Sequence, residues 1–586
     1  PTCAQLATDP ANGLAGNPVI TSATSVVVPP AGSNLGYCNV QITYSAKSGP
    51  ADGYAVGQSQ AIRIGVGLPL SSADGGTGGV RGAWNGKLEN LGGGGLVGNV
   101  GSTTSATNAG YVGSSTDGGH TTAENGALGN FGVIQATNTL NVGKINDYII
   151  ESVHQQVEWA KQISTTYYAM AATRNYWNGC STGGRQGFAL AQNFGDEFDG
   201  FLVGAPAFFH EAFRLSDAWP ALVNRDNLVA NGLPALTSAK MTQAINSAIA
   251  ACDVQGTDVV ADGIIDDPRA CKFSAKANIC GAPTAPATNC LTSAEAAAVD
   301  KIWDGPRNHL GKLIWYPFDR GAPIGVGFAT IPSSAGQVVA WDHADLTFSV
   351  NNLYSTRAAA SANVLGQPNP IAYEDEALLG ARTVNDLTET VSTNLDAVRK
   401  RGGKIIMWQG ASDQLIRWRD SVDYYRYVAT RYGNGKADFA GLQSWFRYYH
   451  APGVQHCGGG VGPSPLTTLP NRNSQLFDDL VKWVEQDFVP GSAGLTTNGG
   501  ILATGGSGNP TRTRPICPWP TTAIYNGTGS TDVASNFHCG GDLDANPEAL
   551  CTMLRAKYKH ENEGAVDTSD SAIPAGQCNA AVIAKP

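Results

Sequence analysis

The stretch from residue 146 to residue 203 constrains the fold most, because helix and strand signals alternate along it. The predicted order is an amphipathic helix from Ile149 to Ile163, a strand over Arg174–Asn178, a glycine turn over Gly179–Gly187, a helix over Phe188–Phe194 and a buried strand over Phe201–Val203. Asn146 or Asp147 is the expected N-cap of the first helix. Such alternation is typical of a parallel sheet covered by helices, so the sequence predicts an α/β fold.

The alternation is interrupted and then resumes, which indicates an insertion. From about Phe208 to about Leu395 the pattern is irregular and rich in aromatic residues. Strand-like runs return at Lys404–Trp408 and Trp445–Tyr449. We therefore predict a discontinuous sheet domain, residues 1–207 and 396–586, with residues 208–395 inserted as a second unit. The glycine-rich stretch 75–129 is predicted to form loops and tight turns.

The chain contains 12 cysteines, an even number, and none forms a CxxC pair. This pattern favours six disulfides, and hence a secreted or periplasmic protein, over a zinc site or a redox motif. The alternative is a cytosolic protein with buried free thiols. Three local bridges are predicted, namely Cys252 with Cys271, Cys280 with Cys290, and Cys517 with Cys539. The other cysteines are Cys3, Cys38, Cys180, Cys457, Cys551 and Cys578.

Charge and hydropathy argue against two classes of partner. The chain has 38 Lys and Arg residues against 48 Asp and Glu, a formal net charge of −10, and its basic residues are scattered. Neither nucleic acid nor an anionic membrane surface is therefore an expected partner. No apolar run approaches the ~20 residues that a membrane-spanning helix needs. The sequence carries no signal for an oligomeric state.

Residues 179–183, Gly-Cys-Ser-Thr-Gly, match the pattern G-x-S-x-G. Between a strand and a helix this spacing forms a nucleophile elbow, whose turn requires small residues two positions before and after Ser181. The backbone N–H of Thr182 would then point toward a developing oxyanion. A glycine-rich chain also produces the pentapeptide by chance as an ordinary turn. Its predicted place between a strand and a helix favours Ser181 as a nucleophile.

A serine hydroxyl needs a base, and this fold places the acid and then the histidine after the serine in the chain. Asp413 follows the predicted strand Lys404–Trp408, and His456 follows the predicted strand Trp445–Tyr449. Asp413 would orient His456, and His456 would carry the proton. His120 is the rival base, but it precedes the serine.

Two cysteines flank the proposed nucleophile and base. Cys180 directly precedes Ser181, and Cys457 directly follows His456, although 277 positions separate the two cysteines. A bridge between them would hold Ser181 and His456 together. In the chain-entropy model a loop this long contributes at most roughly 5–6 kcal/mol, and other crosslinks reduce that figure.

Together these motifs resemble the tannase and feruloyl esterase family. The resemblance rests on the run Gly179–Gly187, on Asp413 and on the pair His456–Cys457, and it covers roughly residues 38–539. It implies an α/β-hydrolase fold with a large lid, which corresponds here to residues 208–395, and a disulfide beside the triad. It also implies that the glycine loop supplies a second oxyanion donor, the backbone N–H of Gly92.

The same resemblance implies a structural calcium ion in the lid. The expected ligands are the carboxylates of Asp253, Asp258 and Asp262 and the backbone carbonyls of Val260 and Ile264. Hard oxygen donors on a short loop, with a glycine at the turn, suit Ca²⁺. From the residues alone, an acidic surface loop explains the segment equally well.

The expected reaction is hydrolysis of a small carboxylic ester through an acyl-enzyme on Ser181. The family acts on esters of aromatic acids, namely hydroxycinnamates, gallate and terephthalate mono-esters. Thr182 and Gln186 resemble the feruloyl esterase version of the serine motif, and Gln409 departs from the histidine of the terephthalate enzymes. Hydroxycinnamoyl esters, derived from plant cell walls or polyphenols, are thus the expected substrates. Alternatives are a tannase, a terephthalate mono-ester hydrolase, a peptidase and a calcium-stabilised secreted binding protein without activity.

Overall fold

The structure is a computed structural model that describes residues 1–125, 130–134, 137, 139–210, 213, 217, 219–254, 260–306, 315–326, 390–466, 474–491 and 500–545. Its internal contacts divide the chain into two compact units. The first unit comprises Pro1–Pro206, Leu395–Ile406 and Thr468–Phe488, and the second comprises Ala207–Asn394, Met407–Thr467 and Val489–Pro586. The divisions after Pro206 and Asn394 lie within one residue of the predicted insertion boundaries. Residues 407–467 and 489–586, however, group with the second unit, and the division into a catalytic domain and a lid stays a prediction.

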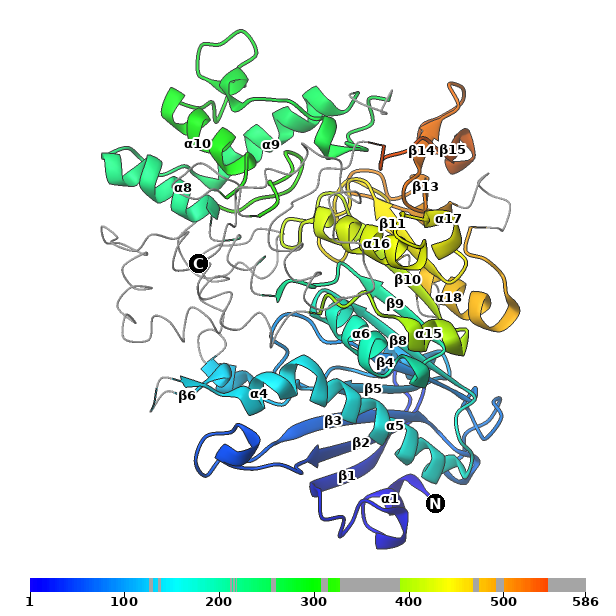
Figure 1. Ribbon diagram of the computed structural model, residues 1–586. Helices are drawn as coiled ribbons and strands as arrows, with labels where there is room; N and C mark the ends of the chain where they lie inside the picture. Colours follow the sequence, from blue (N-terminus) through cyan, green and yellow to red (C-terminus); the bar gives the residue numbers. More distant parts are fainter. Residues whose placement is uncertain are drawn as a thin grey trace. The chain divides into compact units, whose positions relative to one another are not determined.

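Nine strands form the main sheet, which together with its helices confirms the α/β class (Figure 1). In chain order they are β1 (Ile20–Val28), β2 (Tyr37–Tyr44), β3 (Ile62–Pro69), β4 (Lys87–Leu91), β5 (Val112–Thr116), β8 (Arg174–Cys180), β9 (Gly200–Gly204), β10 (Lys404–Gly410) and β11 (Phe446–Ala451). Their order in the sheet is β1-β2-β3-β5-β4-β8-β9-β10-β11. The first three residues of β10 belong to the first unit and the rest to the second.

The sheet changes from antiparallel to parallel at β5. The neighbouring pairs β1–β2, β2–β3 and β3–β5 are antiparallel. The neighbouring pairs β5–β4, β4–β8 and β8–β9 are parallel. The predicted strands at 174–178 and 201–203 are confirmed as β8 and β9. Strands β4 and β5 lie within the glycine-rich stretch that was predicted to form loops, so that prediction is wrong for them. Their polar residues find partners in the sheet, since Ser114 donates to Asn90 and Asn90 donates to Asn175, both at 2.7 Å.

The predicted helix before β8 begins earlier than expected. A continuous helical segment runs through α4 (Val142–Asn146), a π-helical turn (Asp147–Glu151) and α5 (Ser152–Tyr168). The predicted caps Asn146 and Asp147 are wrong, because both have helical backbone angles and the cap is Asn141, whose side chain accepts from the Lys144 N–H at 3.4 Å. Asp147 instead accepts hydrogen bonds from Tyr54 at 2.8 Å and Gln60 at 2.7 Å inside the core.

The core of the first unit lies between the sheet and the helix α5 (Figure 1). Alternate residues of β2 and β3 point to this side, and α5 packs on them with Ala160 and Ile163. The other helices of this unit are α1 (Cys3–Leu6), α2 (Thr104–Asn108), α3 (Thr122–Asn125), α6 (Thr182–Asn193), α15 (Asp396–Arg401) and α18 (Gln475–Gln486). A two-stranded ribbon, β6 (Val133–Ile134) with β7 (Thr139–Leu140), completes it.

The second unit has its own helical core. Helices α8 (Trp219–Asn227), α9 (Ser238–Cys252) and α10 (Ser293–Trp303) bury a cluster that includes Met241, Val299 and Trp303. The unit also contains α16 (Trp418–Tyr432), α17 (Phe439–Leu442) and two hairpins, β12 (Ile501–Thr504) with β13 (Thr513–Ile516) and β14 (Thr522–Tyr525) with β15 (Phe537–Gly540). Among the described helices of both units, none combines the length and the apolar character needed to span a bilayer.

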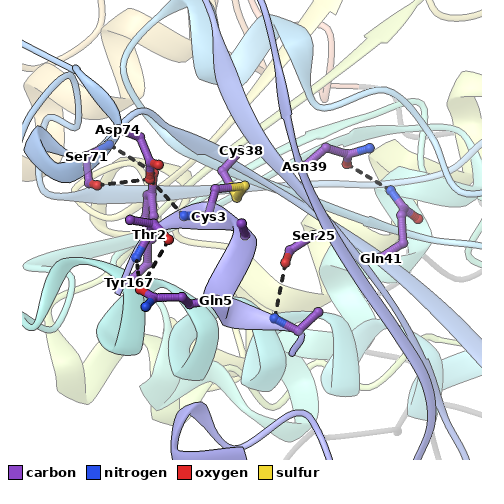
Figure 2. The surroundings of a disulfide bond; sticks show 12 residues. Thr2, Cys3, Gln5, Ser25, Cys38, Asn39, Gln41, Ser71, Asp74 and Tyr167 are labelled. Atoms are coloured by element: carbon purple, nitrogen blue, oxygen red, sulfur yellow. Dashed lines mark hydrogen bonds between the residues drawn. A yellow bond between two sulfur atoms is a disulfide. The ribbon is translucent and has the colours of Figure 1, made fainter. Parts of the chain in front are cut away.

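Each of the two units contains disulfide bonds. The three predicted local bridges, Cys252–Cys271, Cys280–Cys290 and Cys517–Cys539, are confirmed. A further bridge, Cys3–Cys38, ties the first helix to β2, and Figure 2 shows Asp74 beside it. Asp74 accepts from the Cys3 backbone N–H at 2.8 Å and from the Tyr167 hydroxyl at 2.6 Å, so the chain start is fixed to α5 as well. Cys551 and Cys578 lie outside the described residues.

Candidate active site

Ser181 lies in the predicted turn between a strand and a helix. Strand β8 ends at Cys180 and helix α6 begins at Thr182, so Ser181 is the single residue between them. Its backbone angles are φ 63° and ψ −125°, an unfavourable conformation for a residue with a Cβ. Two hydrogen bonds hold it there, from the Ser181 N–H to the Gly204 carbonyl at 2.9 Å and from the Arg185 N–H to the Ser181 carbonyl at 3.0 Å. Strain of this kind typically costs about 1–3 kcal/mol and is concentrated at functional sites.

The glycines around Ser181 are required by close backbone contacts. A Cβ on Gly179 would come within 2.6 Å of the Gly183 carbonyl oxygen. A Cβ on Gly92 would come within 2.6 Å of the Gly183 Cα, and one on Gly184 would overlap the Gly204 carbonyl oxygen. These distances explain in steric terms why the serine motif needs glycines, and they show that the glycine loop after β4 packs directly on the first turn of α6.

The two predicted oxyanion donors differ in their hydrogen bonding. Thr182 is the first residue of α6, where helix geometry leaves the N–H without an intrahelical acceptor, and in the described part of the chain no other acceptor contacts it. Its side chain donates to the Gly95 carbonyl at 2.6 Å. The Gly92 N–H, in contrast, donates to the Asn178 carbonyl at 2.9 Å. The role of Gly92 stays a prediction, and an oxyanion would have to compete with Asn178 for that N–H.

The structure brings Asp413 and His456 together in the second unit, as the sequence predicts. His456 Nδ1 lies 2.9 Å from Asp413 Oδ2, and the two side chains are 12% and 0% exposed. The other carboxylate oxygen of Asp413 accepts from the backbone N–H groups of Leu415 and Ile416, both at 2.9 Å. Asp413 is therefore held by the loop that follows β10, and it presents one oxygen to the imidazole.

Opposing effects set the pKa of His456. Burial lowers it, because the imidazolium loses hydration, but the charge and hydrogen bond of Asp413 and the charge of Asp217 raise it, and the net pKa lies above its usual value. Asp217 in turn pairs with Arg417 at 2.9 Å, and both side chains are 1% exposed. Arg417 also donates to the carbonyls of Gln414 and Leu415 at 2.9 and 2.8 Å. This guanidinium thus supports the loop that holds Asp413.

Gln409 is a positioning residue whose role the sequence did not reveal. It lies in β10, four residues before Asp413, and its amide nitrogen donates to Asp413 Oδ2 at 3.3 Å and to the Ile416 carbonyl at 2.7 Å. Its amide oxygen accepts from Ser421. The sequence marked Gln409 only as a substrate-related position, because a glutamine within a strand carries no signal of a carboxylate partner.

The predicted calcium loop is partly described. Asp253 Oδ1 and Asp262 Oδ1 both accept from the Ile264 N–H, at 3.1 and 3.0 Å, so their carboxylates face one another across the turn. Gly263 has φ +85°, the left-handed conformation that this turn needs. Arg514 forms an ion pair with Asp262. Carboxylate oxygens are donors that suit a hard divalent cation, but both oxygens of Asp253 already accept from backbone N–H groups, of Gly263 at 2.8 Å and of Ile264 at 3.1 Å. Asp258 lies outside the described residues.

Sequence comparison identifies the group of proteins to which this fold and these sites belong. The sequence model of the family described as "Tannase and feruloyl esterase" matches residues 80–540. The chain belongs to this family. Carboxylic ester hydrolysis is the activity of its members, and the chain is therefore a carboxylic ester hydrolase.

Individual relatives of this family cover most of the chain. A "Probable feruloyl esterase" from Arthroderma benhamiae is 29% identical over 87% of this chain and 87% of its own length. A "Mono(2-hydroxyethyl) terephthalate hydrolase" from Piscinibacter sakaiensis is 28% identical over 78% of this chain and 79% of its own. The crystal structure of feruloyl esterase B from Aspergillus oryzae superposes with a TM-score of 0.69 at 22% identity, covering 92% of this chain and all of that one. This likeness confirms the α/β-hydrolase fold.

His120, the alternative candidate for the base, is packed in the core. His120 stacks on Phe131 with ring centroids 3.7 Å apart, and its Nδ1 lies 3.2 Å from the Gly118 carbonyl oxygen. Burial lowers the pKa of His120 to about 4. Packing therefore explains this residue.

The residues of the proposed triad are divided between the two units. Ser181 belongs to the first unit and the Asp413–His456 pair to the second, so the contact between Ser181 and His456 stays a prediction.

Replacing Asp413 should lower the pKa of His456. In Asp413→Asn the burial of the ring remains while the negative charge is lost, so the pKa should fall below the wild-type value. The measurement is an NMR titration of the His456 imidazole in the full-length protein. Asp532→Asn, whose carboxylate pairs with Arg512 at 2.7 Å, is the matched control and should leave the titration unchanged. An unshifted or raised pKa in Asp413→Asn would contradict the electrostatic assignment.

Proposed function

We propose that the protein is a secreted or periplasmic esterase that hydrolyses esters of aromatic acids, hydroxycinnamoyl esters such as ferulates above all, through Ser181, His456 and Asp413. The observation that carries the proposal is the hydrogen bond of 2.9 Å between His456 Nδ1 and the buried Asp413 carboxylate. With Nδ1 committed to Asp413, Nε2 is the ring atom that takes the serine proton. The strained backbone at Ser181 and the Thr182 N–H, which has no acceptor among the described residues, support the same assignment.

The reaction then proceeds in two halves. His456 Nε2 takes the proton of Ser181 Oγ while Oγ attacks the ester carbonyl carbon, and the carbonyl oxygen becomes an oxyanion facing the Thr182 N–H. The carbon–oxygen bond to the alcohol breaks, and the alcohol leaves with the proton from His456. Water then gives a proton to His456 and attacks the acyl carbon. Ser181 leaves, recovers its proton, and the aromatic acid is released.

The choice of substrate rests on the relatives and on two residues. The relatives are described as a probable feruloyl esterase and a mono(2-hydroxyethyl) terephthalate hydrolase. Thr182 and Gln186 resemble the feruloyl esterase version of the serine motif. In this structure Gln186 accepts from the Gly93 N–H at 3.0 Å, so the residue type at this position also holds the glycine loop. The residue types at positions 182 and 186 favour feruloyl esters from plant cell walls or polyphenols over galloyl and terephthalate esters.

Initial rates on three esters test this function. Methyl ferulate should be hydrolysed fastest, ahead of methyl gallate and mono(2-hydroxyethyl) terephthalate. Ser181→Ala should lower every rate by at least about 10⁴-fold, because the nucleophile is lost. Ser33→Ala, at an exposed serine, is the matched control and should retain activity. Background rates on all three esters would contradict the proposal, and a highest rate on gallate or terephthalate would replace the ferulate assignment.

We also propose that Cys180 and Cys457 form one bridge beside the triad. Both cysteines are disulfide-bonded. A direct bridge would join the residue before Ser181 to the residue after His456 and so limit the distance between nucleophile and base. Cys457 has φ 57°, a strained conformation next to the proposed base, which fits a functional constraint.

Removing this bridge should lower activity while the fold persists. In Cys180→Ala/Cys457→Ala we expect kcat/KM on methyl ferulate to fall by roughly 10- to 100-fold, since a shift of about 1 Å at a reacting pair has that effect. Circular dichroism checks the fold, and Cys280→Ala/Cys290→Ala is the control for losing a disulfide elsewhere. An unchanged kcat/KM would refute the clamp.

The calcium site remains part of the proposal. Asp253, Asp258 and Asp262 would bind Ca²⁺ with the carbonyls of Val260 and Ile264, and the ion would crosslink the loop after α9 without taking part in the chemistry. Asp253 is 7% exposed, so a nearby cation would offset the burial of its charge. Arg514 forms an ion pair with Asp262, and its charge also acts on Asp253.

Titration of Ca²⁺ into chelator-treated protein should reveal one site. Calorimetry should give a stoichiometry of one, and Asp253→Asn or Asp262→Asn should weaken binding at least about tenfold, because each loses a charged ligand. Asp304→Asn, in the same unit and 56% exposed, is the matched control. No calcium binding by the wild type, or equal binding by all variants, would show that the segment is an acidic loop only.

A further inference from the structure

The helical segment before β8 contains one turn of π-helix, Asp147–Glu151, between α4 and α5. Here the N–H of Ser152 donates to the carbonyl of Asp147, five residues back instead of four. Single turns of this kind occur frequently at functional sites. The first two residues of the turn are both fully buried, and they have different partners. Asp147 accepts from polar side chains inside the core, whereas the hydroxyl of Tyr148 is directed to the glycine loop after β4.

Arg185 fixes this turn to the helix that follows Ser181. Its side chain is fully buried, and it donates from Nη1 to the Ile149 carbonyl at 3.0 Å and from Nη2 to the Tyr148 carbonyl at 3.2 Å. The guanidinium carbon also lies 5.0 Å from the centre of the Tyr148 ring, within the range of a cation–π contact. Hydrogen bonds from a charged donor are about twice as strong as neutral ones. The position of Tyr148 is therefore tied to α6, the helix that carries Arg185.

Two hydroxyl groups converge on the carbonyl of Gly95. The Tyr148 hydroxyl donates to it at 2.8 Å and the Thr182 hydroxyl at 2.6 Å, and the two hydroxyl oxygens lie 3.5 Å apart. Gly95 is the last of four consecutive glycines, and its φ of +55° is in the left-handed region. Gln186 binds the same run of glycines from α6, by accepting from the Gly93 N–H at 3.0 Å. Side chains from two helical segments thus hold the backbone of this loop.

The glycine loop depends on such contacts because it has no side chains of its own. Glycine loses more conformational freedom on folding than any other residue, and four in succession cannot be ordered by side-chain packing. The loop carries the Gly92 N–H, and the first turn of α6 carries the Thr182 N–H, the two predicted oxyanion donors. Groups that stabilise an oxyanion must be held within about 0.5 Å of their productive positions. A hydroxyl that fixes the loop beside the start of α6 therefore bears on the rate of the chemical step.

We propose that Tyr148 is a positioning residue for ester hydrolysis at Ser181, through its hydrogen bond to the Gly95 carbonyl. The inference rests on the proposed function. Arg185 and the π-helical turn fix the phenol ring, the phenol hydroxyl fixes the loop, and the loop keeps the two predicted oxyanion donors at a set distance from one another. Tyr148 transfers no proton in the reaction, since its hydroxyl donates to Gly95. Its effect is on the geometry around the oxyanion and not on the binding of the ester.

The test removes one hydroxyl group. In Tyr148→Phe we expect kcat on methyl ferulate to fall about tenfold, because a small displacement of the oxyanion donors slows the chemistry. KM should stay within about twofold of the wild-type value, because both half-reactions pass through an oxyanion and the contacts that bind the ester are kept. Tyr168→Phe is the matched control, since the Tyr168 hydroxyl donates to the Pro69 carbonyl at 2.5 Å and is also buried, at the other end of the parallel strands. This control should lower the Tm to a similar extent and keep the wild-type kcat.

A second measurement needs no substrate. Hydrogen–deuterium exchange of the backbone amides of residues 92–97 should be about tenfold faster in Tyr148→Phe than in the wild type, since the loop loses a contact that holds it closed. Tyr168→Phe should exchange these amides at the wild-type rate. Unchanged exchange in Tyr148→Phe would show that its hydroxyl does not hold the loop.

The activity measurements separate two failures. If the wild type does not hydrolyse methyl ferulate or the other two esters, the proposed function is wrong. If the wild type is active, three results overturn the positioning role while the function stands: an unchanged kcat in Tyr148→Phe, an equal loss of kcat in Tyr168→Phe, or a loss in Tyr148→Phe that lies in KM alone.

Discussion

Around Ser181 the backbone packs so closely that three glycines have no room for a side chain. Gly179 and Gly92 both contact Gly183, and Gly184 contacts the Gly204 carbonyl. These contacts bring β8, α6, β9 and the loop after β4 together at one point. Ser181 lies there with an unfavourable φ of 63°, and its backbone is held by hydrogen bonds with Gly204 and Arg185. This packing positions the glycine loop against the first turn of α6, where the N–H of Thr182 lies.

In the second unit, charges and hydrogen bonds position the residues of the candidate site, whereas close backbone packing does so in the first. Asp413 and Asp217 are buried carboxyl groups that each have a partner, since Asp217 pairs with the Arg417 guanidinium and Asp413 lies 2.9 Å from His456 Nδ1. Burial alone would lower the pKa of His456, and the two aspartates reverse that effect. Gln409 and the backbone N–H groups of Leu415 and Ile416 complete the set of donors to Asp413. The loop after β10 is thus fixed by hydrogen bonds to a charged group, which are stronger than those between neutral groups.

Much of the parallel part of the sheet was predictable, and the exceptions have physical causes. Strand β8 was recognised from its aromatic residues and β9 from its contiguous apolar residues. Helix α6 was recognised from its apolar period, but it begins at Thr182, inside the stretch predicted as a glycine turn. Strands β4 and β5 were missed because Asn90 and Ser114 look like loop residues, although buried amide and hydroxyl groups are satisfied once they hydrogen-bond to each other. The helix start was misplaced because Asp147 resembles a cap, whereas its partners Tyr54 and Gln60 are distant in the sequence.

By itself the sequence determined the family of the chain and the residues proposed for its chemistry, namely Ser181 between glycines, followed in the chain by Asp413 and His456. These are local sequence patterns, and steric and chemical rules explain them without knowledge of the tertiary structure. Only the tertiary structure decided which groups support them. Gln409 and Arg417 hold the loop that carries Asp413, and the Asn178 carbonyl accepts from the Gly92 N–H. Such partners are set by strand register and packing across many intervening residues, and residue type alone does not encode that proximity.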